Sequence, residues 1–530
     1  MFGGTFSASA CLRIRVGTAA IGIPLLLAGL VRAAELDHYD ALANGPMAEG
    51  RPTPETSKAL KDELLFQRAT QTYLWALPLI NTLGMKAGSE KTFGAGYNVL
   101  PVWKKRLDAK TLVTTPNSDV IYAMNYLDLG KDGAMVLEVP PGLQGILLDF
   151  WQRPIPGPKI GASTFFGDVG LPGPDGGKGG KFLILPPGYR HNKPLPVGNF
   201  IYRSGTDNVF VFLRAFYKDP SNLAPAVALM EHTKIYPLGP PARVKPMQYP
   251  DASGVPVNML PISDSSAFDQ LKLLIDSEGS NLADSDWLGL IATIGIVKGQ
   301  PFNPDAPTRA ILDRAAKTAY KMSRVIGFEE AVAGRSYRVY PDRRWLNPLA
   351  DGTPSNPSGA LDLSWRRTAG GFLDMDARIW FFTDYYAISP GMISQVPGKG
   401  AKYMIGFTDS QGTPLSGDAS YRLKLPPHIP AANFWSVTLY DAENASGLAN
   451  GQPFPSFGSR DKPARNEDGS TDLYLGPSAP EAKGANWLAT VPGKGYFAIL
   501  RLYSPTEAAI NKNWKPGDIE KIESVGRALQ

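Results

Sequence analysis

Cysteine is nearly absent from this sequence. Its only copy among 530 residues, Cys11, lies within the first 33 residues, which we interpret below as a cleaved leader. The rest of the chain therefore offers no disulfide bond, no thiolate nucleophile and no cysteine ligand for zinc. Without covalent cross-links the fold depends on its hydrophobic core, and hydrophobic residues are 43% of the chain, which is enough for a sizeable one.

Histidine and familiar catalytic motifs are also scarce. The four histidines, His38, His191, His232 and His428, match neither the H-x-x-x-H nor the H-E-x-x-H spacing, so we expect no histidine-built metal centre. The chain has no G-x-S-x-G motif, which excludes hydrolases that use that nucleophile turn. No pattern in the sequence identifies a cofactor.

Long apolar runs are absent except near the N-terminus. Val16 to Val31 is an apolar run of about 16 residues, shorter than the roughly 20 residues that span a membrane. Arg13 and Arg15 precede this run. After it, Val31-Arg32-Ala33 places residues that a signal peptidase site tolerates at the −3 and −1 positions, with cleavage expected after Ala33. These features predict a signal peptide over residues 1–33, and hence a periplasmic or secreted protein without a transmembrane segment in its mature chain. An uncleaved anchor helix is the alternative.

A strong excess of positive charge is missing too. The whole chain has a formal net charge of +5, but three arginines and no acidic residue fall in the expected signal peptide. The mature chain therefore keeps a surplus of only about two positive charges. Because so small a surplus gives little attraction to phosphate backbones, we expect no nucleic-acid partner.

Glycine and proline, in contrast, are abundant. The 55 glycines and 48 prolines follow no Gly-X-Y period, which excludes collagen, and they suit short strands joined by tight turns. Strand-type apolar runs occur in two stretches, separated by one with helical spacing. The pattern predicts a mainly β fold with α, in which β-rich domains at 60–260 and 370–520 flank a helical segment at 261–345.

Helical spacing also predicts individual helices. Glu63 to Leu83 is expected to form an amphipathic helix that breaks near Pro78, after a loose leader over residues 35–60. A later helix begins near Pro307, and Arg324 is expected on its solvated face.

Two glycine-rich or acidic loops have compositions that suggest ion binding. Residues 173–181 resemble a phosphate loop, but they lack the Walker spacing and precede a strand rather than a helix. Residues 466–472 are rich in oxygen ligands, as a calcium loop would be. The simpler interpretation of both loops is a turn between strands.

The remaining chemistry lies where polar side chains stand among aromatic ones. The stretch Thr115 to Tyr122 combines amide, carboxylate and phenol groups, Asp149 is followed closely by a tryptophan, and Arg203 precedes Asp207 by four residues. The alternative for each is a turn or a buried structural pair. The catalytic candidates are Asp119, Arg203 and Arg501, and the ligand-binding candidates are Asn117, Tyr122, Trp151, Trp435 and Trp487.

Arg501 stands out because it interrupts an apolar strand-type run, Phe497 to Tyr503. Strict alternation would place Arg501 on one face with Ile499 and the two ends of the run, and both faces are largely apolar. The guanidinium should therefore be covered, and a covered guanidinium needs carboxylate or carbonyl partners. Asp441 and Asp472 are the carboxylates that we expect as partners.

Two stretches of the chain resemble domain families of unknown function. Residues 66–238 resemble DUF1254, and residues 415–514 resemble its usual companion, DUF1214. The DUF1254 resemblance rests on Thr115-Pro116-Asn117-Ser118-Asp119-Val120-Ile121-Tyr122, the glycine-rich run at 173–181, Pro186-Pro187-Gly188-Tyr189 and Tyr202-Arg203-Ser204-Gly205-Thr206. The DUF1214 resemblance rests on Phe434-Trp435-Ser436-Val437-Thr438-Leu439-Tyr440-Asp441, Asp468-Gly469-Ser470, Asn486-Trp487-Leu488 and Leu500-Arg501-Leu502-Tyr503-Ser504-Pro505.

The resemblance implies two β-sandwich-like modules, one of them close to a jelly roll. It also implies a bacterial secreted or envelope protein, and oligomer formation in some members, so a homo-oligomer is one expectation. It brings no established reaction, and function has to be argued from the site rather than from the fold.

Two functional hypotheses remain open, and whether the protein is an enzyme is not decided by the sequence. The first is an exported envelope or secreted protein that binds a small or oligomeric polar ligand in an aromatic-lined cleft or interface. The second is a cysteine-independent secreted hydrolase in which Asp119 is the acid or base and Arg203 or Arg501 stabilises charge. Convergence of these side chains on one cleft would favour the second hypothesis.

Overall fold

The computed structural model describes residues 37–190, 194–240, 244–279, 282–333, 337–349, 373–393, 395–481 and 484–523. The expected signal peptide, residues 1–33, lies outside the described residues. The chain divides into two compact units, one ending at Leu65 and one beginning at Phe66.

The first unit contains regular structure where the sequence predicted a loose leader. Residues 37–43 are helical, and β1 (Met47–Ala48) pairs with β2 (Arg51–Pro52) as a short antiparallel hairpin. Glu49 and Gly50, which join the two strands, both have positive φ, as a tight two-residue hairpin turn requires. The prediction for this segment was wrong because it weighed the prolines and overlooked this turn.

Helix α2 (Pro54–Phe93) continues through Pro78, so the expected break is also wrong. A proline inside a helix costs about 3 kcal/mol, through a lost hydrogen bond and a steric clash. Here Leu77 and Leu79 beside it are fully buried, and burial of one such side chain contributes about 1.5–3 kcal/mol. The Pro78 carbonyl also accepts hydrogen bonds from the side chains of Thr82 and Gln152. Tertiary packing therefore offsets the local penalty.

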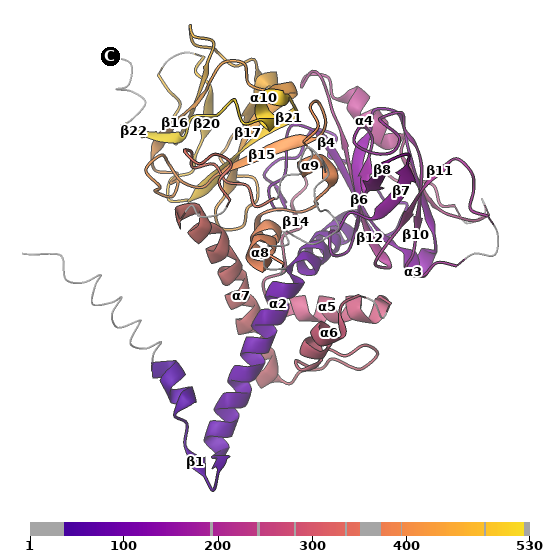
Figure 1. Cartoon of the computed structure of the whole chain (residues 1–530), viewed down its shortest axis with the longest axis vertical. Coiled ribbons are helices and arrows are strands. Elements are labelled where there is room, and N and C mark those ends of the chain that lie inside the picture. The colour runs from indigo at the N-terminus through magenta and orange to yellow at the C-terminus, as the bar shows by residue number, and fades with distance from the viewer. Residues whose placement is uncertain are drawn as a thin grey trace, which may run out of the picture. The chain divides into compact units, whose positions relative to one another are not determined.

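The first β module consists of two four-stranded sheets, coloured purple to magenta in Figure 1. One sheet has the order β11 (Asn199–Arg203), β10 (Gly180–Leu185), β5 (Met135–Val139) and β13 (Lys234–Pro237). The other has the order β4 (Ile121–Asp128), β12 (Asn208–Ala215), β6 (Gln144–Asp149) and β9 (Asp168–Val169). Smaller elements of this region are β3 (Thr111–Leu112), paired with β14 (Val257–Asn258), the hairpin β7 (Pro156–Ile160) and β8 (Ser163–Phe166), α3 (Leu129–Asp132) and α4 (Ala224–Glu231).

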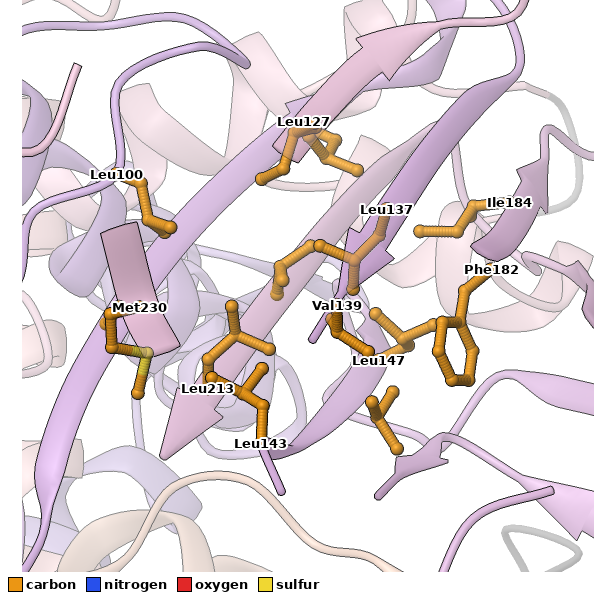
Figure 2. Close-up of a cluster of buried hydrophobic side chains, with 14 of the residues drawn as sticks. Leu100, Leu127, Leu137, Val139, Leu143, Leu147, Phe182, Ile184, Leu213 and Met230 are labelled. Atoms are coloured by element: carbon orange, nitrogen blue, oxygen red, sulfur yellow. The ribbon is translucent and has the colours of Figure 1, made fainter. Parts of the chain in front are cut away.

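The core of this module lies between its two sheets. Figure 2 shows Leu137 and Phe182 from one sheet beside Leu147 and Leu213 from the other, all of them buried. Each strand contributes alternate residues to this core, as the two-residue period of a strand dictates. The arrangement is a β-sandwich.

Helices connect the two β modules. They are α5 (Ser266–Ser277), α6 (Ser285–Ala292), α7 (Ala306–Ala333), α8 (Met375–Asp384) and α9 (Pro390–Ile393). Helical structure therefore extends past residue 370, where the sequence predicted the β-rich domain to begin. Arg324 of α7 is buried rather than solvated, because it forms an ion pair with Asp384 at the end of α8.

The second β module, orange to yellow in Figure 1, repeats the two-sheet plan. One sheet has the order β15 (Ala401–Gly406), β21 (Tyr496–Pro505), β17 (Ala431–Asp441) and β18 (Ser456–Gly458). The other has the order β20 (Trp487–Ala489), β19 (Thr471–Gly476), β16 (Ser420–Leu425) and β22 (Ile519–Ile522). A 3-10 turn, η2 (Ser459–Asp461), and α10 (Glu507–Ile510) complete it. The predicted fold class, mainly β with α and with two β modules flanking a helical segment, is confirmed.

Candidate functional site

One sheet of each module is buried on both faces. In β12, Val211 and Leu213 pack into the core of the first module, whereas Phe212 and Arg214 lie on the opposite face. In the second module, β21 turns Leu500 toward its own core and Arg501 away from it. These outward faces are nevertheless buried because they meet: Phe216, just after β12, contacts the rings of Phe434 and Tyr503, with centroids 6.1 and 6.0 Å apart.

Arg501 lies at this junction, with 2% of its surface exposed. Its guanidinium donates hydrogen bonds to the Thr115 carbonyl (3.0 Å), to Thr438 Oγ1 (3.3 Å) and to the Tyr440 hydroxyl. The expectation of a covered arginine with a carbonyl partner is confirmed. The two expected carboxylates were wrong: Asp441 pairs with Lys494, and Asp472 belongs to β19, in the opposite sheet.

Arg214 is the second buried cation at the junction, with 6% of its surface exposed. It is the cross-strand neighbour of Tyr122, and it lies within electrostatic reach of Tyr403 and Tyr503 in the second module. Its Nε has no hydrogen-bond partner, and its side chain forms no ion pair within the part of the chain that the structure describes.

Tyrosine hydroxyls surround the two guanidinium groups. Burial raises the pKa of Tyr122, Tyr385 and Tyr503 well above the usual value, while the nearby arginines oppose the shift. At neutral pH these side chains are therefore uncharged phenols that can donate hydrogen bonds. The Tyr385 hydroxyl has no partner, nor has Ser436 Oγ, whose residue pairs with Arg501 across the sheet.

The tyrosines at 385 and 386 come from the link after α8. Asn81 of α2 donates to the carbonyls of Phe382 and Tyr385, at 3.0 and 3.3 Å. Gln152 accepts from the Ala387 amide at 2.7 Å. The buried Arg324–Asp384 pair holds the end of α8 just before this link. The link is therefore fixed from three directions, and it places Tyr386 against Phe210 and Phe212.

Backbone strain gathers at the same place. Thr115, Gln152, Ala387 and Ala445 have positive φ although they are not glycines. Thr115 has φ 38° and is held by three hydrogen bonds. Its amide donates to the Ala445 carbonyl, its hydroxyl donates to the Asp384 carbonyl, and its own carbonyl accepts from Arg501. Such strain persists only where surrounding contacts enforce it, and it concentrates at functional sites.

Asp119 connects the two modules. Its carboxylate pairs with Arg106 at 3.0 Å and accepts a hydrogen bond from Ser456 Oγ at 2.8 Å, while Arg460 donates to its backbone carbonyl. Ser456 in turn contacts Thr438, which accepts from Arg501. Asp119 and Arg501 thus belong to one hydrogen-bond network.

Two further predicted residues join this network. Asn117 Oδ1 accepts from the Asp119 amide at 2.7 Å, and its Nδ2 donates to the Tyr503 hydroxyl. Tyr122 lies within electrostatic reach of both Arg214 and Arg501. Four of the eight candidates, Asn117, Asp119, Tyr122 and Arg501, are therefore brought together at the junction.

The other four candidates lie elsewhere. Arg203 is exposed at the end of β11, in the sheet of the first module that does not face the second. Trp435 belongs to the core of the second module, and Trp487 lies on its strand β20, where its indole donates to the Gly476 carbonyl. Trp151 packs against Trp75 and donates to the Leu282 carbonyl.

The sequence contained a signal for Arg214 that was not used. Arg214 interrupts the apolar run Val209 to Ala215 in the same way that Arg501 interrupts its own run. No comparable signal marks the tyrosines at 385 and 386, because their role depends on contacts with α2 and with the first module.

Both loops with ion-binding compositions form turns. In residues 173–181, the Asp175 carboxylate accepts from the amides of Gly170 and Gly179, which closes the turn before β10. In residues 466–472, Asp468 accepts from the Ser470 amide and hydroxyl. Among the described residues no group of three or more histidine, cysteine, aspartate or glutamate side chains could hold a metal ion.

Asp168 is a buried carboxylate on the same face of the first module. It pairs across the sheet with Ile146, and Ile146 pairs with Phe212, so Asp168 faces the same side as Arg214. Burial raises the pKa of Asp168 to about 6, although Ser389, the Gly391 amide and Arg214 each act to lower it.

The raised pKa of Asp168 predicts a pH-dependent stability. Because the native state holds this proton more tightly than the unfolded chain, stability should rise as the pH falls from about 6 to about 4. Asp168→Asn removes the effect, so its stability relative to wild type should be about 1 kcal/mol more favourable at pH 8 than at pH 5. Urea unfolding of both proteins at the two pH values measures this difference. If the free energies of unfolding of Asp168→Asn and wild type differ by the same amount at pH 5 and at pH 8, Asp168 does not titrate in this range.

No helix in the described parts of the chain combines the length and the apolar character needed to cross a membrane. Among solved structures, the chain is similar to the VPA0106 protein from Vibrio parahaemolyticus, with 19% identity and a TM-score of 0.49 over 87% of this chain and 100% of that one. A putative uncharacterized protein from Burkholderia cenocepacia shows 13% identity and a TM-score of 0.36 over 94% and 97% of the two chains. None of the curated proteins matches the sequence.

Family models match both β modules. DUF1254, a protein family of unknown function, matches residues 97–237, and DUF1214, also of unknown function, matches residues 400–507. The first match contains Asn117, Asp119 and Arg214, and the second contains Arg501. The chain is a DUF1254/DUF1214 domain-containing protein, and its candidate site lies where the two domains meet.

Proposed function

We propose that this protein is an exported binding protein that holds a small anionic ligand between its two β modules. The observation that carries the proposal is the pair of buried guanidinium groups, Arg214 and Arg501, on sheets of the two modules that face each other. Among the described residues neither forms an ion pair with a carboxylate. Binding, rather than a reaction, is what this arrangement supports.

The energetic argument rests on the cost of burying charge. An unpaired buried charge is strongly unfavourable unless an opposite charge and hydrogen bonds compensate for it. Arg501 has hydrogen bonds but no anion. Arg214 has Asp168 within electrostatic reach but forms no ion pair with it, and Arg214 Nε has no hydrogen-bond partner. A ligand carboxylate or phosphate would supply the negative charge, and guanidinium groups are well suited to bind either one.

The surroundings favour a small polar ligand. Tyr122, Tyr385 and Tyr503 offer neutral hydroxyl donors, and their rings provide flat apolar surfaces. The hydrolase hypothesis receives no comparable support. Both carboxylate oxygens of Asp119 are engaged, by Arg106 and Ser456, and Arg203 lies on another sheet.

Anion-dependent stabilisation tests the proposal. Succinate and inorganic phosphate, each titrated at constant ionic strength, should raise the melting temperature of the wild-type protein. A ligand at 100 times its Kd contributes about 2.7 kcal/mol. Arg214→Met should abolish this shift, whereas Arg203→Met, which removes an exposed arginine, should retain it. The proposal would be contradicted if neither succinate nor phosphate raised the melting temperature of the wild-type protein. It would also be contradicted if an anion raised the melting temperature of wild type and of Arg214→Met equally.

Export is tested separately. The signal peptide expected over residues 1–33 predicts a mature N-terminus at or within about two residues of Ala34. N-terminal sequencing of the protein recovered from a bacterial periplasm or culture medium measures it. A cytoplasmic product that retains Met1 would refute export, and it would leave the ligand proposal unaffected.

A further inference from the structure

The polar atoms near the two arginines include both hydrogen-bond donors and hydrogen-bond acceptors. Arg214 Nε is an unpartnered donor, and Arg501 offers further guanidinium donors. Beyond Arg214 on the same face, Asp168 Oδ1 is an unpartnered acceptor, although Asp168 is only 2% exposed. Buried polar atoms nearly always have a hydrogen-bond partner, so we expect a bound ligand to supply the partners that these atoms lack.

Ser389 adds a second polar atom beside Asp168. A Cβ at Gly391 would lie 3.4 Å from Asp168 Oδ1 and 3.5 Å from Ser389 Oγ, so both oxygens flank the same point. Ser389 is fully buried, and its hydroxyl lies close enough to the Asp168 carboxylate to lower the pKa of Asp168, but neither Ser389 Oγ nor Asp168 Oδ1 completes a hydrogen bond of standard geometry. The second oxygen of Asp168 is already used, because it accepts from the Gly391 amide at 2.9 Å.

From these groups we infer that the ligand is a small hydroxylated carboxylic acid. Its carboxylate binds the guanidinium groups of Arg214 and Arg501, and its hydroxyl donates to Asp168 Oδ1 and accepts from Ser389. This inference rests on the proposed anion-binding function and specifies its ligand class. A plain carboxylate would satisfy the cationic end and would leave the buried acceptor of Asp168 without a donor.

Discrimination should be large because a site built for a hydroxyl penalises an analogue that lacks it. The cost arises from the buried polar groups that are left unpaired. A hydrogen bond to a charged group corresponds to a preference of about tenfold or more. Asp168 and Ser389 therefore act as specificity-determining residues, while the arginines provide affinity for any small anion.

Matched acid pairs test this inference by calorimetric titration of the full mature chain. The pairs are glycolate with acetate, malate with succinate, and 2-hydroxyglutarate with glutarate, and the members of each pair differ only by one hydroxyl. For at least one pair, wild type should bind the hydroxylated acid about tenfold or more tightly than its partner. Asp168→Ala should remove this preference while it retains binding of the plain acid, and Ser389→Ala should reduce it. Arg214→Met should abolish binding of both members.

The outcomes separate the two proposals. Equal affinities within every pair, together with loss of binding in Arg214→Met, would overturn the hydroxy-acid inference and leave anion binding intact. An Asp168→Ala variant that keeps the full preference would also overturn the inference. If none of the six acids binds, the hydroxy-acid inference fails, and the anion-binding proposal then depends on phosphate. If phosphate does not bind either, both proposals fail. Circular dichroism and melting temperature confirm that each variant is folded, and Asp168→Leu, which is of similar size but has no acceptor atom, serves where the alanine variant is unstable.

Discussion

Asp119→Ala is expected to lower the free energy of unfolding by about 3–5 kcal/mol, because it leaves Arg106 buried without its partner. The two side chains are 7% and 10% exposed, so solvent cannot replace the lost carboxylate. The change also removes the acceptor of the hydrogen bond from Ser456 across the two modules. Urea unfolding followed by tryptophan fluorescence measures the loss.

Two further variants identify the cause of this loss. Glu520→Ala breaks an exposed ion pair with Arg422 and should cost less than about 1 kcal/mol. The double variant Arg106→Met/Asp119→Leu removes both buried charges, and it should recover much of the stability that Asp119→Ala loses. If the double variant is as unstable as the single one, the loss comes from packing or from the Ser456 contact rather than from the unpaired arginine.

Arg214→Met is expected to have the opposite effect and to stabilise the ligand-free protein by about 1–3 kcal/mol, the cost of a buried hydrogen-bond donor without a partner. Its guanidinium is buried, its Nε is without a partner, and the Asp168 carboxylate within electrostatic reach forms no ion pair with it, so an apolar side chain of similar length removes a cost that is only partly compensated. A gain in stability that accompanies a loss of binding is typical of a residue kept for function. Thermal melting in buffer without multivalent anions provides the measurement.

Arg501→Met is the matched comparison for that prediction. Arg501 is equally buried, but it donates to the Thr115 carbonyl and to the Tyr440 hydroxyl, so its removal leaves buried acceptors unpaired. Each buried acceptor left unpaired costs about 1–3 kcal/mol, so Arg501→Met should lower the free energy of unfolding. Destabilisation of similar size in both variants would show that Arg214 has a structural partner, and it would remove the main support for the anion site.

The sequence was sufficient for features that depend on local pattern. The alternation in Phe497 to Tyr503 correctly separated the core-facing residues from the face that carries Arg501. The change from strand to helical spacing and back located the helical segment between two β modules, and the ordered motifs identified both domain families. Turn-forming residues beside aromatics are visible in a short window, which is why the sequence drew attention to Asn117 and Asp119, and the structure places both in the hydrogen-bond network of Arg501.

Only the tertiary structure decided which faces meet, because a strand's pattern does not report what covers its second face. This is why Arg501 bonds the Thr115 carbonyl rather than Asp441, and why Arg203 lies apart from the site although its local sequence looked equally promising. Packing from all sides likewise lets α2 continue through Pro78 against its local preference. Arg214 and Arg501 come from different domains, and both lie near Tyr122 only because the two domains meet. The link at Tyr385 is fixed by hydrogen bonds to residues that are hundreds of positions away in the sequence. Long-range burial, rather than local propensity, therefore creates the charged junction on which the proposed function depends.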